Sequence, residues 1–271
     1  MEKPNNVFAE YCEIGVGTFI ESTAVIRGIS GNAKRIIIGD HCYIGQNVQI
    51  ICDDFSVGDY SRIQHDTNVH GYLPCKIGHN AWIGQFTVID SIGGTTIGNN
   101  CGIGAHSQLW SHIKFGDTLE GCRFKSEKPL TIGNDVWFVG HCIVSPIVAA
   151  DKSMAMVGSV ITKDMEANTI YAGSPAKEIS SKIGNQFLEV DIATKMDMMR
   201  GYLKNSGCSS DQIKIVPSLS DIAFHGSHKS FPDDGKSYFA VSERKYVKQN
   251  HPEEVQFMKY LLPDKAKFVP V

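Results

Sequence analysis

The feature of this sequence that most constrains its fold is a repeat with a period of six residues. An aliphatic residue followed by glycine or by a small or polar residue recurs at this interval, and the residue four positions after it is nearly always small or β-branched, with Asp54 as an exception. Two inward positions per period, one large and one small, suit short strands that meet at tight corners, with glycine where a positive φ is needed. The sequence therefore predicts a mainly β chain folded as a parallel β-helix, with three six-residue segments per coil.

The two inward series are read directly from the sequence. The large positions are Ile38, Ile44, Ile50, Val57, Ile63, Val69, Ile77, Ile83, Ile89, Ile97, Ile103, Leu109, Ile132, Phe138 and Val144. The small positions are Cys42, Val48, Ser61, Thr67, Ala81, Thr87, Cys101, Ser107, Val136, Cys142 and Val148. We expect the cysteines of the second series to pack in the core rather than to carry chemistry.

The surplus residues between coils indicate where a site lies. The large positions step by six within a coil, whereas the step from Leu109 to Ile132 is 23 residues, and all surpluses fall at the same corner. The largest surplus is an excursion loop over about residues 110–130. Loops of this length in a compact domain are usually functional or disordered. This one contains Trp110, His112, Asp117 and Glu120, which favours function.

The six-residue repeat ends near Ile179, and a different pattern follows. Apolar residues at helical spacing predict a helix that ends before Asn205-Ser206-Gly207. Short strands are predicted at 213–216 and 236–241. A last helix is predicted to begin near Pro252 and to end by Pro263. We therefore divide the chain into a β-helix domain at residues 1–180 and a small α+β appendage at residues 181–271. The Met196, Met198 and Met199 cluster is assigned to packing.

Composition excludes several classes of function. The net charge is −3 with both signs interspersed, so the chain lacks the basic field that nucleic-acid binding needs. No stretch approaches the roughly 18 apolar residues of a membrane span. The eight cysteines form no Cys-x-x-Cys pair and are expected to be free thiols in a reducing compartment. We expect a soluble cytoplasmic protein that binds no nucleic acid and inserts into no membrane.

Several segments together carry a family resemblance. The segments Thr131–Trp137, Gly158–Val160, Thr162–Asp164 and Ala172–Lys177 resemble the C-terminal coils of the hexapeptide-repeat sugar and xenobiotic acetyltransferases. The resemblance covers roughly residues 14–180, and Ser174 departs from the asparagine usual in the last motif.

This resemblance implies a left-handed parallel β-helix that assembles as a homotrimer, with acetyl-CoA bound between neighbours and no metal. The reaction would be direct transfer of acetyl to a hydroxyl or amine of a sugar or nucleotide sugar, as in polysaccharide biosynthesis. The family places its catalytic histidine on the excursion loop, and the matching residue is His112. Neutral imidazole can take the acceptor's proton as a general base. Asp117 and Glu120 are candidates to orient it.

The resemblance also implies the cofactor contacts. Trp137 would lie beside the pantetheine arm, the backbone at Gly140 and Gly158 would hydrogen-bond it, and Lys163 and Lys177 would meet the phosphates. The segment between Pro146 and Gly158 is one residue shorter than the family's usual coil. The register near residues 149–157 therefore stays open, because Ala150 and Met154 fit poorly as its inward residues.

Two alternatives remain. His65 and His70 resemble the metal-ligand pair of gamma-class carbonic anhydrases, but the third histidine expected near Ile29 is missing. A non-catalytic scaffold that kept the solenoid is the other alternative. Within the acetyltransferase interpretation, His65, His70 and Trp110 are candidates to line the acceptor pocket.

Overall fold

The computed structural model describes residues 4–222 and 234–271, which form two compact units, Met1–Phe187 and Leu188–Val271. The first unit extends past residue 180 because the side chain of Asn168 holds both backbone groups of Phe187, accepting from its N–H at 2.8 Å and donating to its carbonyl at 2.9 Å. The short helix α1 (Ser180–Ile183) belongs to this unit.

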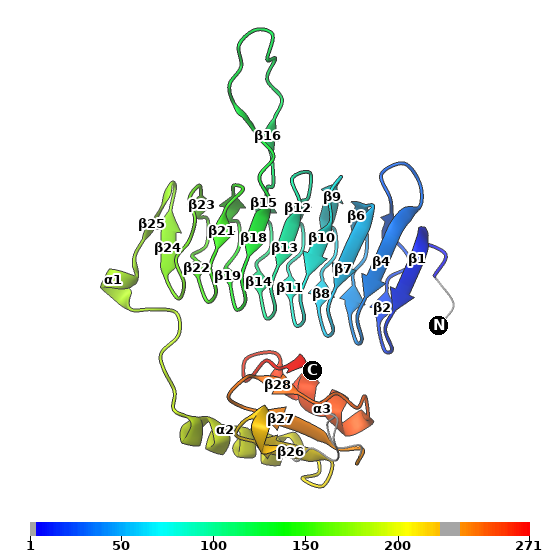
Figure 1. Cartoon of the computed structure of the whole chain (residues 1–271), viewed down its shortest axis with the longest axis vertical. Coiled ribbons are helices and arrows are strands. Elements are labelled where there is room, and N and C mark those ends of the chain that lie inside the picture. Colours follow the sequence, from blue (N-terminus) through cyan, green and yellow to red (C-terminus); the bar gives the residue numbers. More distant parts are fainter. Residues whose placement is uncertain (1–3, 223–233) are drawn as a thin grey trace. The chain divides into compact units, whose positions relative to one another are not determined.

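The first unit is a solenoid with three faces, each a sheet to which successive coils add one parallel strand (Figure 1). Face 1 contains β1 (Ala9–Ile14), β4 (Ala33–Ile38), β7 (Asp54–Val57), β10 (Cys75–Ile77), β13 (Thr95–Ile97), β18 (Leu130–Ile132) and β21 (Val148–Ala149). Face 2 contains β2 (Phe19–Ile20), β5 (Tyr43–Ile44), β8 (Arg62–Ile63), β11 (Trp82–Ile83), β14 (Gly102–Ile103), β19 (Trp137–Phe138), β22 (Met154–Ala155) and β24 (Ile170–Gly173), with β25 (Ala176–Glu178) antiparallel at its edge. Face 3 contains β3 (Val25–Arg27), β6 (Gln49–Cys52), β9 (Asn68–Gly71), β12 (Val88–Asp90), β15 (Gln108–Leu109), β20 (Ile143–Val144) and β23 (Val160–Ile161). The predicted parallel sheets are confirmed.

The large inward residues form continuous columns through the core. Ile77 pairs with Val57 on one side and with Ile97 on the other, and Ile97 pairs in turn with Ile132. All four are at most 4% exposed. Because apolar side chains stack in register from coil to coil, each coil buries the next, and the predicted six-residue pattern is confirmed through Val144.

The small inward position predicted at Val148 was wrong, and the register that the sequence left open begins one residue before Ala150. Val148 is 49% exposed, whereas Ile147 and Ala149 are buried. Ala149, not Ala150, pairs with Ile132, and Ala155 pairs with Phe138. The step from Val144 to Ala149 is therefore five residues. The missing residue is lost at a corner, so the strands after it keep their register.

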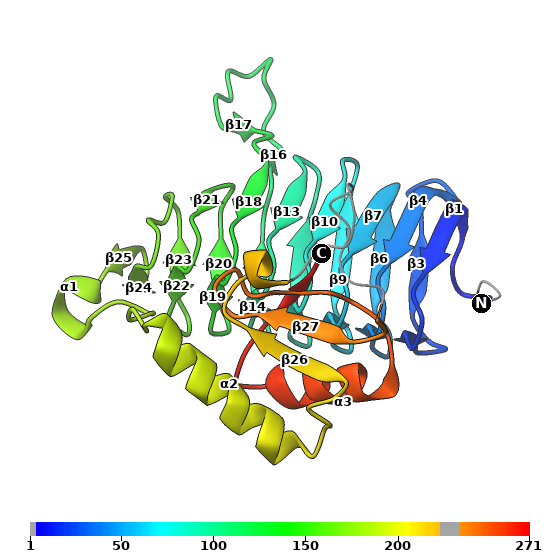
Figure 2. The ribbon, with the colours of Figure 1, turned by 60° about the horizontal axis from the view of Figure 1, so that its bottom comes forward.

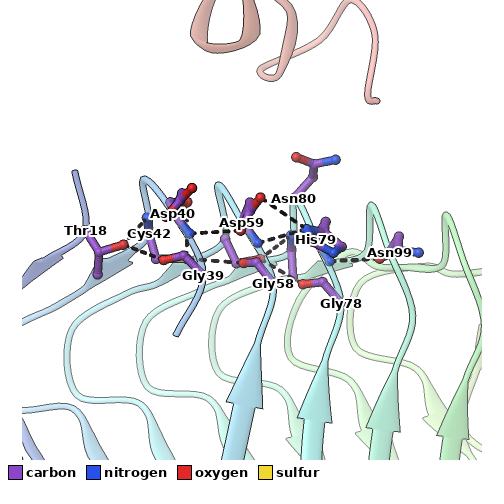
Figure 3. A network of polar contacts seen from close by, with 12 residues as sticks. Thr18, Gly39, Asp40, Cys42, Gly58, Asp59, Gly78, His79, Asn80 and Asn99 are labelled. Carbon is purple, nitrogen blue, oxygen red and sulfur yellow. Dashed lines mark hydrogen bonds and ion pairs between the residues drawn. The ribbon is translucent and has the colours of Figure 1, made fainter. Parts of the chain in front are cut away.

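The corner between faces 1 and 2, which we call the ladder corner, is held by side chains that bond across coils (Figure 3). Asp59 accepts from the N–H of Asp40 at 2.8 Å, and the Nδ1 atom of His79 accepts from the N–H of Asp59 at 2.9 Å. Asn99 then accepts from the N–H of His79 at 2.8 Å. These contacts satisfy corner N–H groups that no sheet partner can reach.

The expectation that glycine supplies the positive φ of the corners was largely wrong. Asparagine, aspartate, histidine and aromatic residues adopt it instead, among them Asn80 at φ 58° and His106 at φ 59°. Several glycines serve close approach between coils. A Cβ on Gly104, for example, would lie 2.0 Å from the carbonyl oxygen of Val139 in the next coil. Side-chain hydrogen bonds make the left-handed conformation tolerable for the polar residues.

The corner between faces 3 and 1, which we call the insertion corner, carries the excursion loop as predicted. The loop forms a hairpin of β16 (Ile113–Lys114) and β17 (Lys125–Ser126), which projects away from the solenoid in Figure 1. Its base therefore lies against the coils that β12 and β15 complete.

The described residues of the second unit form a four-stranded sheet with two α-helices. The strands are β26 (Ile213–Val216), β27 (Ser237–Ala240), β28 (Lys245–Tyr246) and β29 (Val269–Pro270). The helices α2 (Ile192–Ser206) and α3 (Pro252–Leu261) lie next to each other, and α2 packs on β26 (Figure 2). A short 3-10 helix, η1, spans Leu219–Asp221. Met196 and Met199 are buried as predicted, whereas Met198 is exposed.

Candidate active site

His112 is held at the base of the excursion loop by a buried carboxylate. Its Nδ1 atom lies 2.9 Å from Oδ2 of Asp90, the last residue of β12. The same oxygen accepts from the backbone N–H of Ser111 at 2.9 Å and from its hydroxyl at 2.5 Å. The side chains of Asp90 and His112 are 5% and 19% exposed, so the pair is partly removed from water but His112 can still be reached.

This contact determines the chemistry of the imidazole. A carboxylate can only accept hydrogen bonds, so the proton of neutral His112 lies on Nδ1. The Nε2 atom then carries a lone pair and can act as a base. Asp90 also stabilises the imidazolium that forms when Nε2 takes a proton. The arrangement can therefore accept a proton from a hydroxyl or amine.

Asp90, rather than Asp117 or Glu120, contacts Nδ1 of His112. Asp117 accepts from the backbone N–H groups of Leu119 at 2.8 Å and Glu120 at 3.4 Å, and so stabilises its own turn at the tip of the loop. Sequence reasoning missed Asp90. One feature of the sequence could have identified it. Asp90 directly follows the inward-pointing Ile89, at the strand end where the extra residues between two coils begin.

Two of the three candidate acceptor-pocket residues lie near His112. The Trp110 ring is 6.2 Å from the His112 ring, centroid to centroid, in an edge-to-face arrangement. His70 pairs with Asp90 in the register of β9 and β12. His65 instead lies between faces 2 and 3, at what we call the ring corner, where its Nδ1 is 2.8 Å from Asp66. The structure thus brings together His70, Trp110 and His112 and leaves His65 out.

Lys163 and Lys177 line one cavity of about 260 Å³ at the C-terminal end of the solenoid. The other residues around it are Ile161, Thr162, Asp164, Tyr171, Ala176 and Glu178. Lys163 follows β23 and so lies at the insertion corner, two strands beyond β15 in the sheet order of face 3. Two lysines at one cavity suit an anionic group such as a phosphate.

Trp137 and the two predicted glycines lie on another side of the solenoid. Trp137 is 45% exposed on face 2, where its partner in the register is Gly102. Gly140 and Gly158 lie at the ring corner, and the N–H of Gly158 donates to the carbonyl of Gly140 at 2.9 Å. The N–H of Gly158 is thus used within the solenoid, and its role toward pantetheine stays a prediction.

The ring corner also carries a stack of rings. His106 lies 5.0 Å from Phe86 and 4.8 Å from His141, with nearly parallel planes. His106 is therefore part of a column that bridges three coils. It precedes β15, whereas the excursion loop that carries His112 follows this strand, so the two histidines lie at different corners.

The core thiols are poor nucleophiles. Burial raises the pKa of the Cys42 and Cys101 thiols to about 12, and it raises the pKa of Cys75 well above its usual range. The reactive thiolate is therefore scarce near neutral pH. Cys42, Cys101 and Cys142 pack in the core, as expected.

The described part of the chain holds neither a cluster of metal ligands nor a helix suited to a membrane. Among residues 4–222 and 234–271, no three histidine, cysteine, aspartate or glutamate side chains lie close enough to hold one metal ion. Over the same residues, no helix is both long and apolar enough to cross a bilayer.

Similar proteins include named acetyltransferases. No model of a known protein family matches the chain. Galactoside O-acetyltransferase of Escherichia coli (strain K12) is 40% identical over 52 residues, which are 19% of this chain and 26% of that protein. Putative acetyltransferase SAR2635 of Staphylococcus aureus (strain MRSA252) is 35% identical over 75 residues, 27% of this chain and 36% of that protein. The chain thus spans about a quarter to a third of these curated relatives.

One solved structure resembles the chain more extensively in its backbone. A point mutant of AntD, an N-acyltransferase from Bacillus cereus in complex with dTDP and coenzyme A, is 16% identical. The match covers 62% of this chain and 91% of that one, with a TM-score of 0.48.

Proposed function

We propose that the chain is an acetyl-CoA-dependent acetyltransferase that transfers acetyl to a hydroxyl or amine of a saccharide, with His112 as general base. The observation that carries the proposal is the Asp90–His112 contact, which leaves the lone pair on Nε2 of a partly exposed imidazole. The named acetyltransferases among the relatives support the same reaction class. No observation favours metal hydration or a non-catalytic scaffold.

The reaction follows from this geometry. Nε2 of His112 removes the proton of the acceptor hydroxyl as its oxygen attacks the thioester carbonyl. The C–S bond then breaks, the acetyl group stays on the acceptor oxygen, and the proton passes from His112 to the leaving CoA thiolate. The negative charge on the carbonyl oxygen needs a donor during the attack, most simply a backbone N–H. With Asp90 fixing its tautomer, His112 returns to its starting state after each turnover.

The donor is proposed to lie along the insertion corner, on the C-terminal side of His112. The cavity at Lys163 and Lys177 supports this direction, because its two lysines could pair with the phosphates of CoA while the thioester reaches back to His112. Successive parallel strands are about 4.8 Å apart, so the corner at Lys163 lies about 10 Å along the solenoid from the one at His112.

A homotrimer of left-handed β-helices is part of the proposal. Within one chain, Trp137 lies on face 2 and His112 at the insertion corner, on separate sides of the solenoid. If both contact one acetyl-CoA, a second copy must supply one of them. The half-exposed Trp82 and Trp137 on face 2 are also an unusual surface to leave in water. We place the protein in the cytoplasm, where acetyl-CoA is available.

The experiment that tests the reaction uses the whole chain, labelled acetyl-CoA and a panel of sugars, glycosides and nucleotide sugars. Acetylated product is expected with at least one saccharide, and a His112→Ala variant should lose most of this rate. If no member of the panel is acetylated, or if His112→Ala leaves the rate unchanged, the proposal is contradicted.

A further inference from the structure

The insertion corner has an aromatic surface that the proposed chemistry does not use. Tyr72 and Leu73 follow β9 and are 61% and 48% exposed. The Tyr72 ring lies 6.0 Å from the ring of His70, at 73° to it. Leu73 is fixed by its N–H, which donates to the carbonyl of Ser91 at 3.0 Å. We call Tyr72 and Leu73 the Tyr72 shelf.

The Tyr72 shelf and His112 lie on either side of Asp90 along the corner. His70, two residues before Tyr72, pairs with Asp90 on the next strand, and Asp90 contacts His112, which follows β15 on the strand after that. Two strand spacings separate the coils of Tyr72 and His112, which is about 10 Å. This is a separation of the two backbones that two linked sugar rings can span.

The coil between Tyr72 and His112 has few side chains at the insertion corner. The intervening coil turns through Ser91, Ile92, Gly93 and Gly94, so two of its four residues carry no side chain. A Cβ on Gly93 would lie 2.1 Å from the carbonyl oxygen of Ser111, which shows how closely the next coil approaches there. Gly93 is itself buried, and the closely packed backbone at this point forms the floor between the shelf and the base.

The segments that form the shelf and this floor are uncharged apart from Asp90 at one end. Residues 70–74 and 91–94 contain no lysine or arginine, the residues that usually bind phosphates. The flat apolar face of a sugar ring fits an exposed aromatic side chain, since ligand sites combine aromatic walls with few polar groups. The Tyr72 shelf itself therefore suits a sugar ring better than a phosphate, while the Lys114–Glu127 ion pair lies at the base of the neighbouring loop.

We propose that the Tyr72 shelf binds the second ring of a neutral glycoside acceptor whose first ring presents its hydroxyl to His112. The inference rests on the proposed acetyl transfer and narrows its acceptor to saccharides of two or more rings. The donor then occupies the C-terminal side of His112 and the acceptor the N-terminal side. Tyr72 is thus a specificity-determining residue, and acetyl-CoA does not touch it.

The test compares one-ring and two-ring acceptors: methyl glucoside with methyl cellobioside, and methyl galactoside with methyl lactoside. In the unmodified protein, kcat/KM should be higher for at least one two-ring acceptor than for its one-ring counterpart. Tyr72→Ala should lower kcat/KM for that two-ring acceptor by about three- to tenfold, the value of one aromatic contact. It should leave the one-ring acceptor and the KM for acetyl-CoA unchanged.

Two further variants sharpen the comparison. Tyr72→Phe keeps the ring and should retain the preference, which separates stacking from hydrogen bonding by the hydroxyl. Tyr11→Ala removes a tyrosine of similar exposure, 46%, on face 1 and should change no acceptor constant. Circular dichroism of each variant checks that the solenoid remains folded.

The outcomes test sugar binding at the Tyr72 shelf and acetyl transfer at His112 independently. Saturation-transfer NMR with methyl cellobioside and methyl lactoside, without acetyl-CoA, reports binding alone and should show Tyr72-dependent contact with the second ring. Binding of this kind without any transfer would contradict the reaction and support the shelf. Transfer without a two-ring preference, or equal losses for both acceptor lengths in Tyr72→Ala, would overturn the shelf while leaving the reaction intact.

Discussion

Oδ2 of Asp90 lies 2.9 Å from Nδ1 of His112, although 22 residues separate them in sequence. The contact exists because β12 and β15 are neighbours in face 3, so the end of one strand lies beside the start of the excursion that follows the other. The solenoid thus supplies the fixed carboxylate, and the loop supplies the base.

Asp90→Asn is expected to lower kcat strongly. Asparagine can donate to Nδ1, which would favour the tautomer with its proton on Nε2 and so remove the lone pair that takes the acceptor's proton. The decrease should be about 100-fold or more, with the KM for acetyl-CoA nearly unchanged. Steady-state kinetics measure both constants. Asp117→Asn, at the tip of the same loop, is the matched control and should be close to the unmodified protein.

His112→Ala should lower kcat by about 10²–10⁴-fold, the usual contribution of a general base. Acetyl-CoA affinity should change little, because the proposed phosphate contacts lie in later coils. The decline of kcat at acidic pH, which reports protonation of the base, should disappear in the variant. His106→Ala should cost far less, since His106 stacks between Phe86 and His141 at the ring corner. Equal losses at both histidines would reject His112 as the base.

Lys163→Ala should raise the KM for acetyl-CoA by about tenfold, as expected for one charge-assisted hydrogen bond to a phosphate. The effect should shrink as salt is added, because screening weakens the interaction in the unmodified protein. Lys76→Ala is the control, since Lys76 is an exposed lysine on face 1. If both lysines had the same effect, a general influence of net charge would explain it and the cavity would not.

Asn99→Ala should lower the free energy of unfolding by about 1–3 kcal/mol. Its side-chain oxygen accepts from the N–H of His79 at 2.8 Å, and removing it leaves a part-buried donor without that partner. Asn99→Asp keeps an acceptor in place and should cost less. Chemical denaturation of both variants gives the comparison. Equal stability of Asn99→Ala and the unmodified protein would show that water replaces the ladder contact without loss.

Light scattering at micromolar concentration should give a mass near three times 29.8 kDa. The expectation follows from the separation of Trp137 and His112 on one chain, which requires a second copy to complete the proposed donor site. A monomer that still transfers acetyl would contradict this arrangement and would place the donor along the insertion corner alone.

The sequence predicted the core well because inward residues of a solenoid repeat at fixed intervals. The columns through Ile77 and Ile97 follow from that period and from nothing else. The register after Val144 could not be predicted, because a residue lost at a corner leaves no mark in composition or polarity. Only the strand pairing shows that Ala149 replaces Ala150 beneath Ile132.

The candidate site was predictable only in part. The length of the excursion and the resemblance identified His112, but its partner depends on which strand end lies beside the loop. Which strand end lies beside the loop depends on how the coils stack and not on spacing in the sequence. Asp117 and Glu120 were chosen because they are close to His112 in sequence. His65 and His70 looked like a pair because they are close in sequence. His65 lies at the ring corner, however, and His70 near the far end of β9, so they lie at opposite ends of that strand.

The five-residue step between Val144 and Ala149 indicates where a chain of this fold tolerates insertions and deletions. The solenoid lost a residue at its insertion corner and gained a hairpin at the same corner one coil earlier, while the strands on either side stayed in register. Corners therefore tolerate insertions and deletions that strands would not. A lineage of these chains could exchange one acceptor for another by altering loop length at a single edge, without repacking its interior.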